Sequence, residues 1–169
     1  MNGSLRTDRL LLVPLTLPQL KLCLTNLSAL EVELGLSISR DVLSGRVRGA
    51  IRKKIEKMTG MDETHHPWQT YWLIIVSDDS FGAGLAGFKG YPDESGSSEI
   101  GYGIDPAYQN KGYMSEAVKA LVDWALQHPF CNRVTATTVE NPASRRLLEK
   151  LGAHLLADDK GSTSWEFTR

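Results

Sequence analysis

The hydrophobic pattern of the first third of the chain predicts one strand and two helices. Residues 5–15 (LRTDRLLLVPL) predict a strand that closes at Pro14. Leucines then recur at three- and four-residue spacing, which predicts a helix over residues 18–36. Residues 45–58 place apolar residues on one helical stripe and basic residues on the opposite face, so we expect a second helix with a solvated basic surface.

The middle third contains three short apolar stretches separated by turn sequences. Residues 71–77, 83–91 and 98–104 each have the length and composition of a strand. The segments DDSFG and DESGS between them are rich in turn-forming residues. The pattern predicts an antiparallel meander of three strands.

The last third alternates between helix and strand. Residues 112–128 form an amphipathic helical pattern that stops at Pro129, and residues 133–139 form a β-branched strand. Asn141 and Pro142 predict a capped helix start, and Gly152 predicts its left-handed end. Strands 98–104 and 133–139 flank a helix, which favours a parallel pair with a right-handed crossover. The stretches HLLA and STSWEFT predict two final short strands.

Composition indicates an ordinary globular protein. The chain has 169 residues, 41% of them apolar and 23% charged, which suits a single domain over residues 1–169. The net charge of −1 gives no argument for a nucleic-acid or membrane partner. We expect the four tryptophans to lie in the core rather than to form a binding platform.

The cysteines and the N-terminal sequence favour a cytoplasmic location. Cys23 and Cys131 form no CxxC motif and are expected to be reduced and buried. The apolar run near the N-terminus is too short for a signal peptide, and no stretch approaches the roughly 18 apolar residues of a membrane span.

The segment GAGLAG (82–87) matches the letters of a dinucleotide-binding fingerprint. That fingerprint needs a helix directly after it to hold a pyrophosphate, but FKGYPDESG continues with strand and turn residues. We therefore interpret the glycines as a bend where another part of the chain packs closely on a strand.

The junction YQNKGYMSEA (108–117) has the composition of an anion-binding helix start. Gly112 allows a tight turn, and the following helix offers free N–H groups and the positive end of its dipole. Lys111 adds charge, and Ser115 can cap or donate. These features suit a phosphate, although an ordinary polar loop before a helix has the same spacing.

Resemblance to a known family adds to this interpretation. IGYGIDPAYQNKGYMSEA resembles the acetyl-CoA pyrophosphate loop of the GNAT N-acetyltransferase superfamily, and ENPASRRLLEKLGA resembles its later strand-to-helix segment. LRTDRLLLVPL resembles the opening strand of the ribosomal-protein alanine N-acetyltransferase (RimJ/RimL-like) branch. The resemblance implies a mixed α/β GNAT fold, with a mostly antiparallel sheet of six to seven strands, one parallel splayed pair and about four helices.

The resemblance also implies the site residues and the reaction. The chain would transfer the acetyl group of acetyl-CoA to a primary amine, either a protein N-terminus or a small molecule, and would need no metal. The implied cofactor-binding residues are Tyr102, Gly103, Ile104, Gln109, Asn110, Lys111, Gly112, Tyr113, Met114, Ser115 and Asn141. The implied catalytic residues are Glu99 as the base, Asn141 and Ser144. A homodimer is compatible with this fold.

Several of these assignments have plain structural alternatives. Glu99 could be a solvent-facing strand residue, Asn141 a simple helix cap, and Ser144 an ordinary first-turn serine. The chain also departs from the family, with the bulky Met114 at a small position and Leu148 where many members have the tyrosine that protonates CoA. The proton donor is then Ser144, water or absent. A non-catalytic CoA-binding module is therefore the second hypothesis, and a mononucleotide-binding protein is a distant third.

Overall fold

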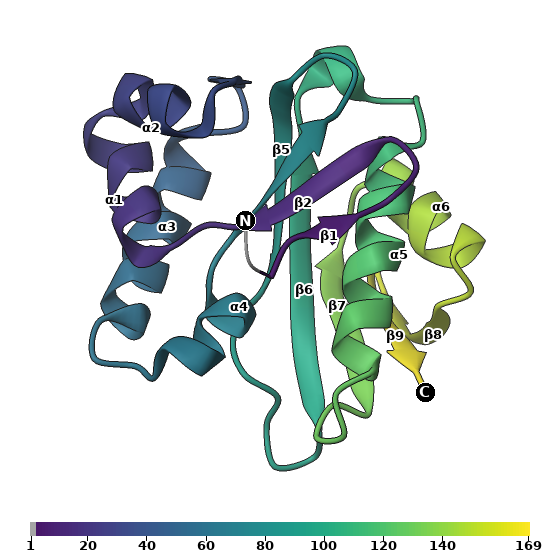
Figure 1. Cartoon of the computed structure of the whole chain (residues 1–169). Helices are drawn as coiled ribbons and strands as arrows, with labels where there is room; N and C mark the ends of the chain where they lie inside the picture. The colour runs from purple at the N-terminus through teal and green to yellow at the C-terminus, as the bar shows by residue number, and fades with distance from the viewer. Residues whose placement is uncertain (1–2) are drawn as a thin grey trace.

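The computed structural model describes residues 3–169 as a central sheet with helices on both faces (Figure 1). Its strands are β1 (Leu5–Arg6), β2 (Leu10–Pro14), β3 (Ser37–Ile38), β4 (Trp72–Val76), β5 (Phe81–Phe88), β6 (Ser97–Ile104), β7 (Arg133–Val139), β8 (His154–Asp159) and β9 (Ser162–Thr168). Its α-helices are α1 (Leu17–Thr25), α2 (Leu27–Leu34), α3 (Gly45–Met58), α4 (His66–Gln69), α5 (Tyr113–Leu126) and α6 (Pro142–Lys150), with 3₁₀ turns η1 (Glu63–His65) and η2 (Pro106–Tyr108).

The sheet runs in the order β1-β2-β4-β5-β6-β7-β9-β8, and the short strand β3 pairs with β5. All neighbours along this path are antiparallel except β6 and β7, as the crossover through α5 predicts. The mixed α/β GNAT fold is thus confirmed. Across residues 3–169 the sheet has nine strands rather than six to seven, because β1 and β3 have two residues each and are too short to leave an alternating pattern.

Helices cover both faces of the sheet (Figure 1), and each face buries its own hydrophobic cluster. On one face α1, α2 and α3 cover a cluster that includes Leu73, Ile75 and Leu85. On the other face α5 packs on Trp72, Ile74 and neighbouring residues, and Leu148 of α6 joins this cluster. The expectation that the tryptophans belong to the core is confirmed: Trp68, Trp72 and Trp165 are buried, and Trp124 packs against Trp68 and Trp72.

Two predicted elements are divided in the structure. Residues 5–15 form two strands, β1 and β2, because the chain turns back between them and pairs Leu5 with Leu12. The helix expected over residues 18–36 breaks at Asn26, where φ is −160° and the side chain accepts a hydrogen bond from the Ala29 N–H. Leucine spacing continues across this break because both helices face the same cluster, so periodicity alone could not reveal it.

The parallel pair β6 and β7 is splayed. Their register covers three residue pairs, from Ser97 with Arg133 to Glu99 with Thr135. Further along, Tyr102, Gly103 and Ile104 pair with β5 on one side only. A bulge in β7 between Ala136 and Val139, with Thr138 at a φ of 54°, bends the strand end. The two strand ends therefore separate at the side where α5 and α6 begin.

The segment GAGLAG lies within β5, and the interpretation of its glycines is confirmed. A Cβ on Gly84 would lie 2.6 Å from the Gly103 oxygen, and one on Gly87 would lie 2.6 Å from the Thr70 oxygen. The register with β4 also shifts between Ile74 and Ile75. The glycines allow close backbone packing in the strand that supports β6.

The helix starts and ends predicted from local sequence agree well with the structure. Asn141 caps α6 and Pro142 is its first residue, while Gly152 follows the helix with a φ of 83°. Helix α5 ends at Leu126, two residues before the predicted end. Both cysteines are free and buried. Within residues 3–169 we find no helix with the length and apolar character that crossing a membrane requires.

Candidate cofactor and active site

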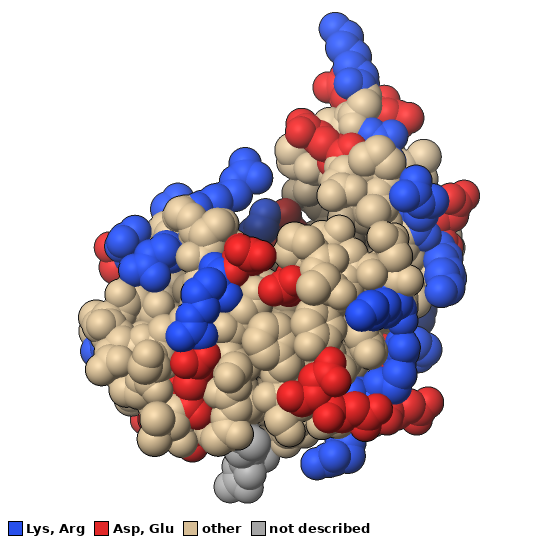
Figure 2. All heavy atoms as spheres, turned by 90° about the horizontal axis from the view of Figure 1, so that it is seen from above, with Lys and Arg blue, Asp and Glu red and all other residues tan. Residues whose placement is uncertain are grey.

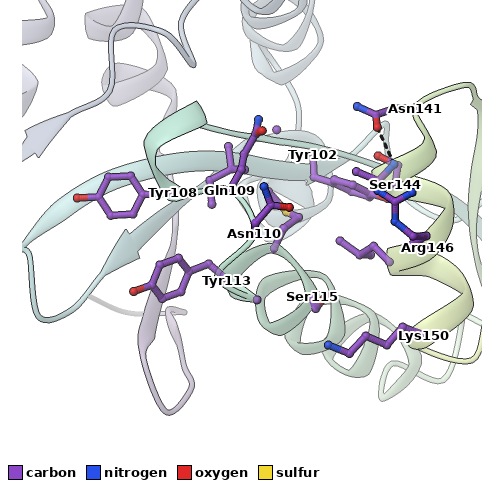
Figure 3. A pocket seen from close by; sticks show the side chains of 16 residues that line it. Tyr102, Tyr108, Gln109, Asn110, Tyr113, Ser115, Asn141, Ser144, Arg146 and Lys150 are labelled. Atoms are coloured by element: carbon purple, nitrogen blue, oxygen red, sulfur yellow. Dashed lines mark hydrogen bonds between the residues drawn. The ribbon is translucent and has the colours of Figure 1, made fainter.

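A cavity of about 440 Å³ lies where β6 and β7 separate (Figure 3). Its walls come from the end of β6, the loop before α5, the first turn of α5 and one face of α6. It is lined by Tyr102, Gly103, Ile104, Tyr108, Gln109, Asn110, Gly112, Tyr113, Met114, Ser115, Asn141, Ala143, Ser144, Arg146, Leu147 and Lys150. Most residues that the sequence assigns to cofactor binding are therefore brought together.

The start of α5 supplies backbone donors to this cavity. Gly112 is the N-cap of α5 and has a φ of 81°, a conformation that glycine adopts without strain. The first N–H groups of a helix have no carbonyl partner within the helix, and the helix dipole places positive potential there. Tyr113, Met114 and Ser115 occupy this first turn and line the cavity, which favours an anionic ligand.

Arg9 holds the loop before α5 in place through hydrogen bonds, a role that no pattern in the sequence indicated. Its Nη1 donates to the Lys111 oxygen at 2.8 Å, and its Nε donates to Glu116 Oε2 at 2.8 Å. Its guanidinium carbon lies 4.5 Å from the centre of the Tyr113 ring. Burial alone would raise the pKa of the Glu116 carboxyl, but hydrogen bonds from Thr7 and Arg9 lower that pKa below its ordinary value. Arg9 thus neutralises an acid in the first turn of α5.

Helix α6 forms the opposite wall. The Asn141 side chain accepts a hydrogen bond of 2.8 Å from the Ala143 N–H, so its capping role is confirmed. Four other lining residues of α6, Ala143, Arg146, Leu147 and Lys150, were missed from the sequence. They follow i, i+3, i+4, i+7 spacing, which is one face of a helix, and that pattern was the available signal. Arg146 and Lys150 bring positive charge to the cavity (Figure 3).

Two predicted site residues lie outside the cavity lining. Lys111 places its Nζ 5.3 Å from the centre of the Tyr108 ring, and the residue is exposed. Glu99 pairs with Lys89 and accepts a hydrogen bond of 2.7 Å from the Thr137 hydroxyl. Because side chains alternate along a strand, Glu99 lies on the same face of β6 as Gly101 and Gly103.

Leu148 of α6 stands at the position where many members of the resembled family carry a tyrosine, and it offers no polar group. Leu148 is fully buried in the core and is absent from the cavity lining. One turn earlier, Ser144 lines the cavity, and Tyr102 enters it from β6 (Figure 3). Burial raises the pKa of the Tyr102 hydroxyl, and the nearby Ser144 partly offsets this rise.

Both signs of charge are interspersed over the face seen in Figure 2. In the part of the chain that the structure describes, histidine, cysteine and carboxylate side chains form no group of three or more that could hold a metal ion.

Comparison with known protein sequences identifies the family of this chain. Residues 21–154 match the model of the acetyltransferase (GNAT) domain. The chain is 40% identical over 82 residues to the uncharacterized N-acetyltransferase YjdG of Bacillus subtilis, which is 48% of this chain and 49% of that protein. It is 32% identical over 104 residues to the probable N-acetyltransferase YjcK of the same organism, 61% of this chain and 53% of that protein. The chain thus spans about half the length of the curated relatives it matches.

Solved structures share the fold across the whole chain. The ribosomal-protein-S5-alanine acetyltransferase from Vibrio fischeri superimposes with a TM-score of 0.68 at 15% identity, covering 99% of this chain and 97% of that one. The microcin C7 self-immunity acetyltransferase MccE, solved with acetyl-CoA and AMP, gives a TM-score of 0.62 at 14% identity, covering 96% and 94%. Sequence match, fold and cavity agree, and the chain belongs to the GNAT acetyltransferase family.

Proposed function

We propose that this protein transfers the acetyl group of acetyl-CoA to a primary amine. The observation that carries the proposal is the cavity between the splayed strands, which has helix N–H donors on one wall and cationic side chains on the other. Such a site suits a long ligand that is anionic at one end. The donors present therefore fit acetyl-CoA, which would supply the activated acetyl group as a thioester.

Different elements of the chain would bind different parts of acetyl-CoA. The first turn of α5 and the side chains of Gln109 and Asn110 would hold the pyrophosphate. Arg146 and Lys150 would add charge from α6. The free edge of β6 at Gly103 and Ile104 would pair with the pantetheine arm, and its backbone N–H would polarise the acetyl carbonyl.

Glu99 is the proposed base for the acceptor amine. It lies on the face of β6 that Gly103 shares, and Lys89 and Thr137 fix its carboxylate in one orientation. A base near the reacting amine keeps that amine neutral and nucleophilic. The acceptor would approach from this face, opposite the side that α5 covers.

The acceptor is proposed only as a class. Solved proteins with this fold include one named a ribosomal-protein-S5-alanine acetyltransferase and one named a putative ribosomal-protein-serine acetyltransferase, which supports a peptide N-terminus as one candidate. A small primary amine is the other. The helices α1 to α3, which cover the acceptor side, lie where the chain least resembles the family motifs.

The first test is a calorimetric titration of the protein with acetyl-CoA, with ATP as the control ligand. Selective binding of acetyl-CoA is expected. Thiol release is then followed with a panel of alanine- and serine-initiated peptides, polyamines and amino acids. Glu99→Gln is expected to lower kcat by about a hundredfold and to leave acetyl-CoA affinity intact.

The competing hypothesis is a CoA-binding module without catalysis, which the buried Leu148 favours. Binding without thiol release across the whole panel would support it. Tighter binding of ATP than of acetyl-CoA would contradict both hypotheses.

A further inference from the structure

Tyr102 carries a buried hydroxyl that lacks a well-formed hydrogen bond within the fold. The hydroxyl oxygen is shielded from solvent and makes no hydrogen bond of good geometry within the described range 3–169. The Ser144 hydroxyl nevertheless lies close enough to lower the pKa of the phenol, so the two groups can exchange a proton after a small adjustment. Burying a hydroxyl without a partner costs folding free energy, because the hydrogen bonds it made to water are lost. Such a group is the kind that a ligand completes.

The surroundings of this hydroxyl place it in the cavity between β6 and α6. Tyr102 lines the cavity, and in Figure 3 its side chain reaches from β6 toward α6, where Ser144 lies beside it. Tyr102 immediately precedes Gly103 and Ile104, whose backbone edge faces the same cavity. The phenol therefore lies next to the strand edge at which the thioester would be held.

From this geometry we infer that Tyr102 is the proton donor to the departing CoA sulfur, with Ser144 as its link to solvent. The inference rests on the proposed function. Leu148, on the next turn of α6 after Ser144, is fully buried and carries no proton to give. The strand would thus supply the phenol that the helix lacks.

The proton and electron balance of the step is simple. The amine nitrogen attacks the acetyl carbon, the new C–N bond forms, and the C–S bond breaks with its electron pair going to sulfur. The Tyr102 O–H proton passes to that sulfur and gives the free thiol. The Tyr102 oxygen then takes a proton from the Ser144 hydroxyl, which regains one from solvent, while the nitrogen loses its extra proton to the base.

The state of the Tyr102 hydroxyl agrees with this role. Burial raises its pKa above the ordinary value of a tyrosine, so the phenol keeps its proton at neutral pH. A donor must hold its proton until the transition state.

The test compares Tyr102→Phe with wild type in three measurements. First, kcat with the best acceptor of the panel is expected to fall by about a hundredfold while acetyl-CoA affinity stays within about twofold. Second, the pKa of the thiol of bound CoA, followed by thiolate absorbance, is expected to be lower in wild type than in the variant, because a phenol hydrogen bond stabilises the thiolate. Third, the variant should unfold at the same temperature or higher, since it loses an unpaired buried hydroxyl.

The matched control is Tyr71→Phe, which removes the hydroxyl of another largely buried tyrosine, packed in the cluster on the opposite face. It should change none of the three values. Full turnover by Tyr102→Phe, or an unchanged thiol pKa, would overturn the inference. A loss of turnover in Ser144→Ala but not in Tyr102→Phe would make Ser144 the donor.

The measurements also separate this inference from the proposed function. If wild type fails to bind CoA, the proposed function itself fails. If it binds CoA but acetylates no member of the panel, the thiol titration alone decides the role of Tyr102.

Discussion

Arg9 joins the opening strands to the loop that precedes α5. Arg9→Ala would remove two side-chain hydrogen bonds and leave the Glu116 carboxylate without a cationic partner beside the proposed anion-binding helix start, although the Thr7 hydroxyl and the backbone N–H of residue 9 still donate to it. We expect acetyl-CoA affinity to fall roughly tenfold, which corresponds to about 1.4 kcal/mol. Calorimetric titration measures this directly.

A double variant distinguishes loss of the Arg9 positive charge from loss of its support of the loop before α5. In Arg9→Ala with Glu116→Gln the repelling carboxylate is gone, so part of the lost affinity should return. Arg52→Ala, at an exposed position on α3, serves as the control for a lost positive charge. Equal affinities for the single and double variants would show that Arg9 acts by shaping the loop rather than by neutralising Glu116.

Lys54 is a buried cation without an acidic partner among the contacts that the structure describes. Its Nζ donates to the Gln69 and Phe88 oxygens at 2.9 Å each and lies 4.5 Å from the centre of the Tyr71 ring. Burial, followed by repulsion from Lys57 and Lys89, lowers its pKa from 10.5 to about 8.

This lowered pKa predicts how stability depends on pH. Between about pH 8 and 10.5 the unfolded chain holds the Lys54 proton and the folded chain does not, so folding stability contributed by this group rises with pH. The unfolding free energy of wild type minus that of Lys54→Met should rise by up to about 3 kcal/mol across this range. The pKa of Cys23 is raised to about 11, so this thiol makes stability fall as pH rises. Because wild type and variant both carry Cys23, its contribution cancels when the two are subtracted. Denaturant unfolding at several pH values measures it, and a constant difference would contradict the prediction.

Among the secondary-structure elements, β5 is the one whose composition looks least like a strand. It contains three glycines, yet it occupies the centre of the sheet between β4 and β6. Its glycines are required because neighbouring backbone approaches where a side chain would stand. The same close packing supports β6 directly behind the cavity.

Gly84→Ala tests this requirement. The added Cβ would meet the Gly103 oxygen at 2.6 Å, and a backbone atom in a sheet cannot move away cheaply. We expect a loss of about 1–3 kcal/mol in unfolding free energy, measured by denaturant titration. Gly101→Ala on β6 is the matched control, because its Cβ would have no atom within 4 Å and should change stability little.

At the level of the whole molecule, the cavity joins two parts of the fold that the splay separates. One wall belongs to β6 and α5, and the other belongs to the region after β7 and α6. A ligand bound there would bridge both parts and stabilise the folded state through mass action.

Hydrogen exchange with and without acetyl-CoA tests this bridging. At a hundredfold excess over Kd, the ligand should stabilise the protein by about 2.7 kcal/mol. Exchange should slow both in residues 109–115 and in α6, whereas ATP should give neither effect. Protection of one wall alone would show that the ligand does not span the cavity.

Sequence was most informative where structure depends on neighbouring residues. The caps at Asn141 and Gly152, the glycine turn at Gly112 and the crossover that makes β6 and β7 parallel all follow from local pattern and chain chirality, and all were predicted. The sequence could propose the loop at residues 109–115 as a ligand site because its donors belong to one continuous segment, and most of these residues do line the cavity.

Other features depend on residues that meet only after folding. Arg9 contacts Glu116 across 107 positions of sequence, so no local pattern could pair them. The break at Asn26 was hidden because both helices bury leucines at compatible spacing. The orphaned hydroxyl of Tyr102 and the cationic face of α6 became visible only once the splay of β6 and β7 opened a cavity between them. Local chemistry thus determined the elements and the loop proposed to bind an anion, whereas long-range packing decided which side chains surround the cavity and what each can do there.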